Sequence, residues 1–218
     1  MRVHIKINAN KTIIPFEHQP LLVGTIHKWL GTNKEHGKVS LYSFSRLEGG
    51  ELNKQGLKFA DGSSFFFSSH KPELIKKLIS GIQVDPVMFH GLEVSEVILE
   101  EDPDLTKREF FLLGSPIFIK KTTDIKTDHI LFNDPRANDC LKETILTKMK
   151  EAGFMDESFD ICFDKSFAKA RTNLVDYNGI KNRTSWCPVI IKGNADTKLF
   201  IWNVGLGNST GIGFGAIK

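Results

Sequence analysis

The alternation and spacing of apolar residues predict two helices and four strands in the first half of the chain. Residues 3–9 alternate polar and apolar side chains as a half-buried strand does. Residues 20–31 place Leu22, Ile26 and Leu30 on one face of a helix that Gly31 would end. The predicted order is a strand at 3–9, a helix at 20–31, strands at 39–44 and around 65–67, a helix at 71–82 and a strand at 91–99.

The second half repeats this order more loosely. A helix over 137–153 has Leu141, Ile145 and Met149 on one face. The other predicted elements are strands at 109–120, 128–132, 158–163, 170–177 and 184–192, a short helix at 195–204 and a terminal strand at 212–217. Strand, helix, two strands, helix and strand is the ferredoxin-like arrangement.

We therefore predict an α+β protein of two tandem ferredoxin-like domains, of the kind that also forms RNA-recognition modules. The acidic connector at 100–104 marks a turn near the boundary, which places the domains at 1–105 and 106–218. Such folds carry an open sheet, but the fold alone does not give a function.

Composition is that of an ordinary globular protein, with 40% hydrophobic and 25% charged residues. No apolar run approaches the roughly 18 residues that a membrane span needs, and the N-terminus lacks the apolar segment of a signal peptide. Cys140, Cys162 and Cys187 show neither paired spacing nor a zinc-site pattern, which favours thiols in a reducing compartment. We expect a cytoplasmic protein that does not bind membranes.

Positive charge is concentrated at the C-terminal end. The whole chain has a net charge of +3, whereas the segment from Lys165 to Lys218 holds eight basic and two acidic residues. This asymmetry favours a polyanion as partner, with a solvated basic face as the alternative. The basic strip consists of Lys165, Lys169, Arg171, Lys181, Arg183 and Lys192, interleaved with Asn173, Asn178, Asn182 and Trp186, which could contact bases or serve only turns and core.

A glycine-rich ending follows the basic strip. Five glycines fall between positions 205 and 215, and backbone N–H groups in such a loop can form a concave anion site. A dinucleotide-binding loop is excluded because no room remains for the helix that it requires. Two interpretations stay open: a turn before the terminal strand, or a cradle for a phosphate backbone formed by Gly207, Asn208, Ser209, Gly211 and Gly213.

Two histidines are candidates for acid–base chemistry, to which the histidine pKa near 6.5 is suited. His36 lies in the polar segment 32–38, where a side chain can reach a ligand, although histidines in such loops are usually only solvated. His27 lies on the flank of the apolar face of its helix, as a boundary residue of the core or as part of a site. The remaining histidines, His4, His18, His70, His90 and His129, have no partner motif.

These features together resemble a known family. The ending from Gly205 to Gly215 resembles the signature loop of the RAMP superfamily, and the whole chain resembles the CRISPR-associated endoribonucleases that cut repeat RNA into guide RNAs. The helix around Gly24 to Leu30, the loop and strand from His36 to Ser45 and the basic strip all agree in position with that family.

The resemblance implies a metal-independent cleavage without a cofactor. The ribose 2′-OH attacks the adjacent phosphate, and the departing 5′-oxygen leaves a 2′,3′-cyclic phosphate. The reaction needs a base, an acid and positive charge at the developing phosphorane. The resemblance implies His36 as general acid or base and His27 as the second group, with Lys38 at the phosphate.

The expected partner is CRISPR repeat RNA, contacted by the basic strip and the glycine-rich ending. The alternative is a non-catalytic RAMP subunit that binds guide RNA inside an effector complex, because it would share the fold and the glycine loop. Association with effector-complex subunits or with a second copy of the chain stays open.

Overall fold

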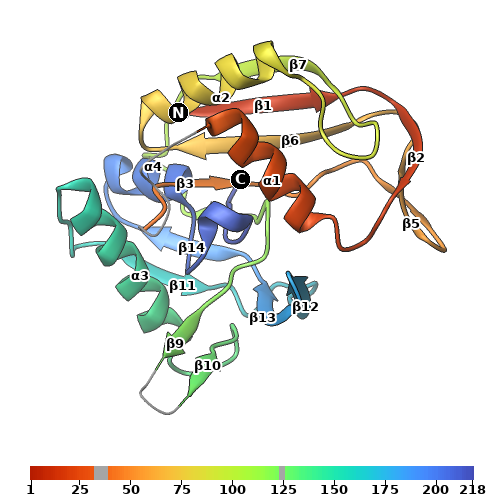
Figure 1. Ribbon diagram of the computed structural model, residues 1–218. Helices are drawn as coiled ribbons and strands as arrows, with labels where there is room; N and C mark the ends of the chain where they lie inside the picture. Colours follow the sequence, from red (N-terminus) through yellow and green to blue (C-terminus); the bar gives the residue numbers. More distant parts are fainter. Residues whose placement is uncertain (32–38, 123–125) are drawn as a thin grey trace.

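The computed structural model describes residues 1–31, 39–122 and 126–218, and its first half has the predicted element order (Figure 1). Four antiparallel strands form a sheet in the order β3-β6-β1-β7. The elements are β1 (Arg2–Ile7), α1 (Gln19–Leu30), β3 (Tyr42–Phe44), β6 (Ser63–Ser69), α2 (Pro72–Val84) and β7 (Val94–Glu100). This is the strand order of a ferredoxin-like domain.

The second half has the same strand order, with the chain end in place of its fourth strand. Strands form a sheet in the order β11-β14-β8, and Leu112 and Lys218 exchange two backbone hydrogen bonds beside β8. The elements are β8 (Phe110–Phe111), α3 (Ala137–Ala152), β11 (Asp160–Phe163), β14 (Val189–Lys192) and α4 (Ala195–Val204). The prediction of two tandem ferredoxin-like domains is confirmed.

Three predicted strands were wrong in extent. The terminal strand expected at 212–217 is replaced by a short 3-10 helix, η1 (Thr210–Ile212), and a single bridge from Ile217 to Leu113. Positive φ angles at Gly213 and Gly215 prevent an extended strand there. The strands expected at 109–120 and 184–192 are interrupted near Pro116 and Pro188, which lack the N–H that a ladder needs.

Insertions occur at matching positions of the two halves. In the first half, β2 (Asn10–Ile14) follows β1 and pairs with the hairpin β4 (Glu51–Asn53) and β5 (Gly56–Phe59), which lies between β3 and β6. In the second half, β9 (Lys120–Thr122) and β10 (Thr127–His129) follow β8, and β12 (Arg171–Tyr177) and β13 (Ile180–Trp186) lie between β11 and β14. These last two hairpins extend from the lower part of the molecule in Figure 1.

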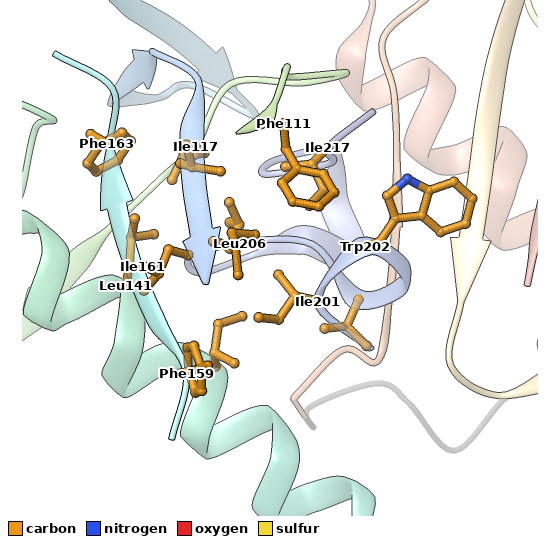
Figure 2. Packing of buried hydrophobic residues seen from close by; sticks show 14 of the residues in the cluster. Phe111, Ile117, Leu141, Phe159, Ile161, Phe163, Ile201, Trp202, Leu206 and Ile217 are labelled. Carbon is orange, nitrogen blue, oxygen red and sulfur yellow. The ribbon is translucent and has the colours of Figure 1, made fainter. Parts of the chain in front are cut away.

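Each half has its own hydrophobic core. The first core takes its buried residues from positions between Val3 and Leu92, and the second takes them from Leu105 to Ile217 together with Leu41. Figure 2 shows part of the second core, with Leu141 from α3 and Phe159, Ile161 and Phe163 from and beside β11 among the labelled side chains. The domain boundary between 105 and 106 stays a prediction.

Helix α4 packs against both halves and is buried on nearly all sides. Phe200 and Ile201 belong to the second core, while Trp202 stacks on the Arg2 guanidinium of β1 at 3.3 Å from ring centroid to Cζ. Arg2 is 2% exposed and donates hydrogen bonds to Ser68 Oγ, Trp202 O and Ile217 O. Burial lowers the pKa of Arg2 to about 9, so the guanidinium keeps its charge at pH 7.

The glycine-rich ending, residues 205–215, passes between the halves, and its glycines allow the close approach. A methyl group at Gly205 would lie 2.8 Å from Ser43 Cβ, and one at Gly213 would lie 2.9 Å from the Phe44 ring. At Gly215, which has φ +67°, a methyl group would overlap the Leu206 carbonyl. The ending is therefore a packed interface segment.

We predict that Gly215→Ala lowers the free energy of unfolding by about 3 kcal/mol, from a left-handed φ and a clash with backbone. Gly179→Ala is the matched control, because Gly179 has φ +80° and open space around it, and it should cost only about 1 kcal/mol. Urea denaturation measures both. Equal losses would contradict the proposed packing of the ending.

Candidate functional site

The glycine-rich ending runs beside α1 and brings His27 to the interface between the halves. The Tyr42 hydroxyl donates to Gly211 O at 3.4 Å and lies 3.4 Å from His27 Nε2. Near the other end of the same helix, Gln19 Nε2 donates to Ile212 O at 2.6 Å. Residues 211–213 are thus bonded directly to α1 through Gln19, and through Tyr42 of β3 they lie next to His27 at its other end.

His27 is half-buried on the flank of α1, where the sequence placed it. Tyr42 is 4% exposed, so its hydroxyl is held by its neighbours. When this hydroxyl donates to Gly211, it accepts from Nε2 of His27. A half-buried imidazole is of the residue type suited to acid–base chemistry near pH 7.

His36 and Lys38, the other two predicted catalytic residues, lie outside the described residues. Their assignment stays a prediction. The described chain ends before them at Gly31, the residue after α1, and resumes at Val39, three residues before β3.

A cleft of about 420 Å³ opens between the two halves at the N-terminal end of α1. Leu22, five residues before His27, also lines the cleft, so the rise along α1 from the cleft to His27 is roughly 7.5 Å at about 1.5 Å per residue. The lining includes Phe16, His18, Gln19, Phe44 and Arg46 from the first half and Leu174, Val175, Asp176, Lys181 and Gly213 from the second. The cleft therefore presents aromatic rings, the Gln19 amide, two cations and two carboxylates, Glu17 and Asp176, to a ligand.

Arg46 and His18 are cleft residues that the sequence analysis missed. Arg46 donates to Gln19 Oε1 at 3.1 Å, and its buried Nε has no hydrogen-bond partner among the described residues. His18 Nδ1 lies 2.9 Å from Pro15 O, and burial lowers the pKa of His18, so the ring is neutral at pH 7. Arg46 directly follows the segment from His36 to Ser45 that resembles the family. This position is the only signal in the local sequence that marks Arg46 as a candidate.

The predicted basic strip is divided among several surfaces. Lys181 lines the cleft, and Arg183 shares its face of the β12–β13 hairpin because the two are alternate residues of β13. Arg171 pairs with Trp186 and points to the opposite face, where its guanidinium lies 5.3 Å from that ring. Lys192 lines a separate hollow beside α3.

All six cations of the strip are nevertheless available to anions. Each is exposed, and none lies within 4.0 Å of a carboxylate in the described part of the chain. The exposed set is Lys165, Lys169, Arg171, Lys181, Arg183 and Lys192.

The predicted glycine-loop contacts have a packing role in the structure. Gly207, Gly211 and Gly213 are buried, while Asn208 and Ser209 are half-buried. Asn208 makes two hydrogen bonds to the chain at the start of β9. Its N–H donates to Phe118 O, and its side-chain oxygen accepts from Lys120 N–H. Contact of these five residues with RNA stays a prediction.

Lys148 of α3 is a buried residue that donates hydrogen bonds to the start of the glycine-rich ending. It is 3% exposed, and its ammonium donates to Val204 O, Gly205 O and Thr210 Oγ1 at 3.1, 2.9 and 3.3 Å. The first two acceptors are the last carbonyls of α4, where a cation also complements the helix dipole. Burial lowers the pKa of Lys148 to about 7.

Two further observations concern only the described residues. No group of three or more His, Cys, Asp or Glu side chains is arranged to hold a metal ion. No helix combines the length and apolar character needed to cross a membrane.

Comparison with known proteins gives matches in sequence and in fold. Residues 100–218 match the family model described as CRISPR associated protein Cas6, C-terminal. No curated protein matches the sequence. A solved structure described as CRISPR associated protein Cas6 is 22% identical with a TM-score of 0.84, over 100% of this chain and 98% of its own.

Two other solved structures share the fold over the whole chain. One, described as a characterization of a Cas6-related gene from Pyrococcus furiosus, is 23% identical with a TM-score of 0.83 and is covered over 97% of its length. The other, described as an RAMP protein binding different RNA substrates, is 21% identical with a TM-score of 0.86 and is covered over 98%. Both alignments cover 100% of this chain.

We predict that Lys148 makes the protein more stable as the pH rises above 7. Between its folded pKa of about 7 and the ordinary value of 10.5, the folded protein releases a proton that the unfolded chain retains. The contribution therefore grows by about 1.4 kcal/mol per pH unit in that window. The variant Lys148→Met should lack this pH-dependent contribution to stability. The difference between variant and wild type in urea denaturation at pH 7 and 9 measures this, and a constant difference would contradict it.

Proposed function

The chain belongs to the family of CRISPR-associated Cas6 proteins, and from this premise we propose that it is an endoribonuclease that cuts CRISPR repeat RNA. Family membership supports a role in processing or binding CRISPR RNA. The observation that carries the finer proposal is the His27–Tyr42 contact, which places an imidazole where the two ferredoxin-like halves meet, on the helix whose other end lines the cleft with Arg46 and Lys181.

The proposed reaction is attack of the ribose 2′-OH on the neighbouring phosphate. The 5′-oxygen leaves with a proton, and the upstream product ends in a 2′,3′-cyclic phosphate. His27 and His36 supply the base and the acid, and Lys38 offsets the charge of the phosphorane. Tyr42 orients His27 through the hydrogen bond to Nε2.

We propose that the RNA strand passes through the cleft between the halves. Arg46 and Lys181 stand on opposite walls, where they can neutralise successive phosphates, and Phe16 offers a half-exposed ring for stacking. The rest of the basic strip extends the contact over the outside of the second half. Each neutralised phosphate would make binding more salt-sensitive, with a slope of about −0.7 for a single strand.

A second candidate function is guide-RNA binding without cleavage. One protein of the same fold is described as an RAMP protein binding different RNA substrates, which supports binding as a separate possibility. Incubation of the purified protein with repeat RNA distinguishes the two, because only the nuclease produces shorter RNA with a cyclic phosphate end.

We predict that His36→Ala abolishes cleavage of repeat RNA and changes the affinity for that RNA by no more than a few-fold. Loss of a general acid or base typically costs about 10²–10⁴ in rate, whereas binding depends mainly on the cations. Gel analysis and filter binding measure the two effects. An equal loss of both would assign His36 to binding or folding.

A second prediction concerns metal ions. Because the proposed attack uses the substrate's own 2′-OH and side-chain acid–base groups, chelation of divalent ions with EDTA should leave the single-turnover rate unchanged within about twofold. The control is an RNA with a 2′-deoxy nucleotide at the cleavage site, which should not be cut. Strict dependence on magnesium, or cleavage of the deoxy substrate, would rule out this mechanism.

A further inference from the structure

Lys148 is a buried amine with three hydrogen-bond partners. When it is protonated, its three N–H groups have three acceptors, two carbonyls at the end of α4 and the hydroxyl of Thr210. In the described part of the chain no carboxylate lies within ion-pairing distance of it. A charge held in this way is costly to bury, and an apolar residue of similar shape would fill the same space at lower cost.

The third acceptor of Lys148 connects it to the candidate catalytic histidine. Thr210 is 1% exposed and begins η1, and the next residue, Gly211, accepts the hydrogen bond from Tyr42. Tyr42 in turn contacts His27 Nε2. The path from Lys148 to the imidazole thus crosses from the second half to the first through a single turn of backbone.

That turn is short, with two backbone hydrogen bonds of its own, from Ile212 N–H to Ser209 O and from Gly213 N–H to Thr210 O. Helix η1 has only three residues, and the residues on either side, Ser209 and Gly213, have positive φ angles of 60° and 87°. Gly211 also packs directly against Ser40 and Tyr42, so a shift of the turn is transmitted to the tyrosine. The bond from Lys148 to Thr210 is the side-chain hydrogen bond that ties the turn to α3, in addition to the bonds that Asn208 makes before it.

We propose that Lys148 is a positioning residue for cleavage: through Thr210 and Gly211 it holds Tyr42 in contact with His27. This inference rests on the proposed function, in which His27 takes part in the reaction. It assigns Lys148 no contact with RNA, because the side chain is enclosed by α3, α4 and η1.

The test compares variants that remove either end of the Lys148–Thr210 bond. Lys148→Met keeps an unbranched apolar chain, and Thr210→Val replaces the hydroxyl by a methyl group of the same shape. Thr210→Ser restores the hydroxyl as the conservative rescue. Lys150→Met, an exposed lysine on the same helix, controls for loss of charge.

Two readouts are needed, single-turnover cleavage at saturating protein and the NMR signals of the His27 imidazole. We expect Lys148→Met and Thr210→Val to lower the cleavage rate constant by at least about tenfold, since small misplacements of a reacting group are costly. RNA affinity should stay within about twofold. Both variants should also shift the His27 ring signals, assigned by their absence in His27→Gln. Thr210→Ser and Lys150→Met should match the wild type in rate and spectrum.

Unchanged ring signals and an unchanged rate in Thr210→Val would overturn the inference. A fall in affinity as large as the fall in rate would do the same, because it would assign Lys148 to binding. If the wild type does not cut RNA at all, the proposed function fails, while the ring signals still decide whether Lys148 positions His27.

Discussion

A buried guanidinium fixes the two halves of this protein against each other. Arg2 stands on the first strand of the first sheet, yet two of its hydrogen bonds end on carbonyls of the second half, Trp202 O and Ile217 O. Its plane lies between the rings of Phe66 and Trp202, at 3.9 and 3.3 Å from Cζ to the ring centroids. A charge is tolerated at such depth only when its donors are satisfied, and stacking on aromatic rings adds to the stabilisation.

The Arg2 contact restricts the path that the C-terminal segment can take. With α4 and residue 217 fixed against β1 and β6, the segment between them has to pass through the space beside β3 and α1. That space leaves no room for side chains at Gly205, Gly211 or Gly213. The glycines of the ending are therefore explained first by packing, and the site follows from it, because the same segment holds Tyr42 and Gln19 in place.

Local signals in the sequence were sufficient for the fold class and for the helices. Helix α4 was predicted over 195–204, which are its observed bounds, and His27 was placed correctly from its angular position on α1. The strands of the second half were harder to predict, because Pro116 and Pro188 interrupt runs that are mostly apolar on both sides of each proline. Of the inserted strands, β10 overlaps the predicted strand at 128–132 and β12 falls within the one at 170–177, whereas β2, β4 and β5 of the first half were not predicted.

The site itself was only partly accessible from the sequence. The basic strip was read as one feature because its residues are close in sequence, but alternation along β12 and β13 separates Arg171 from Lys181 and Arg183. Arg46 and Lys148 acquire their hydrogen-bond partners from residues that are far away along the chain, as the bonds from Arg46 to Gln19 and from Lys148 to Thr210 illustrate. Such contacts depend on how the halves pack, which periodicity and composition do not encode.

The arrangement of the two halves around the RNA is the central claim, and a structure of the complex tests it most directly. The ligand would be a repeat RNA with a 2′-deoxy nucleotide at the cleavage site, so that it stays intact. The expected density follows the cleft between Arg46 and Lys181 and brings the scissile phosphate to the exposed side of His27. Density that avoids the cleft, or a scissile phosphate remote from His27, would contradict it.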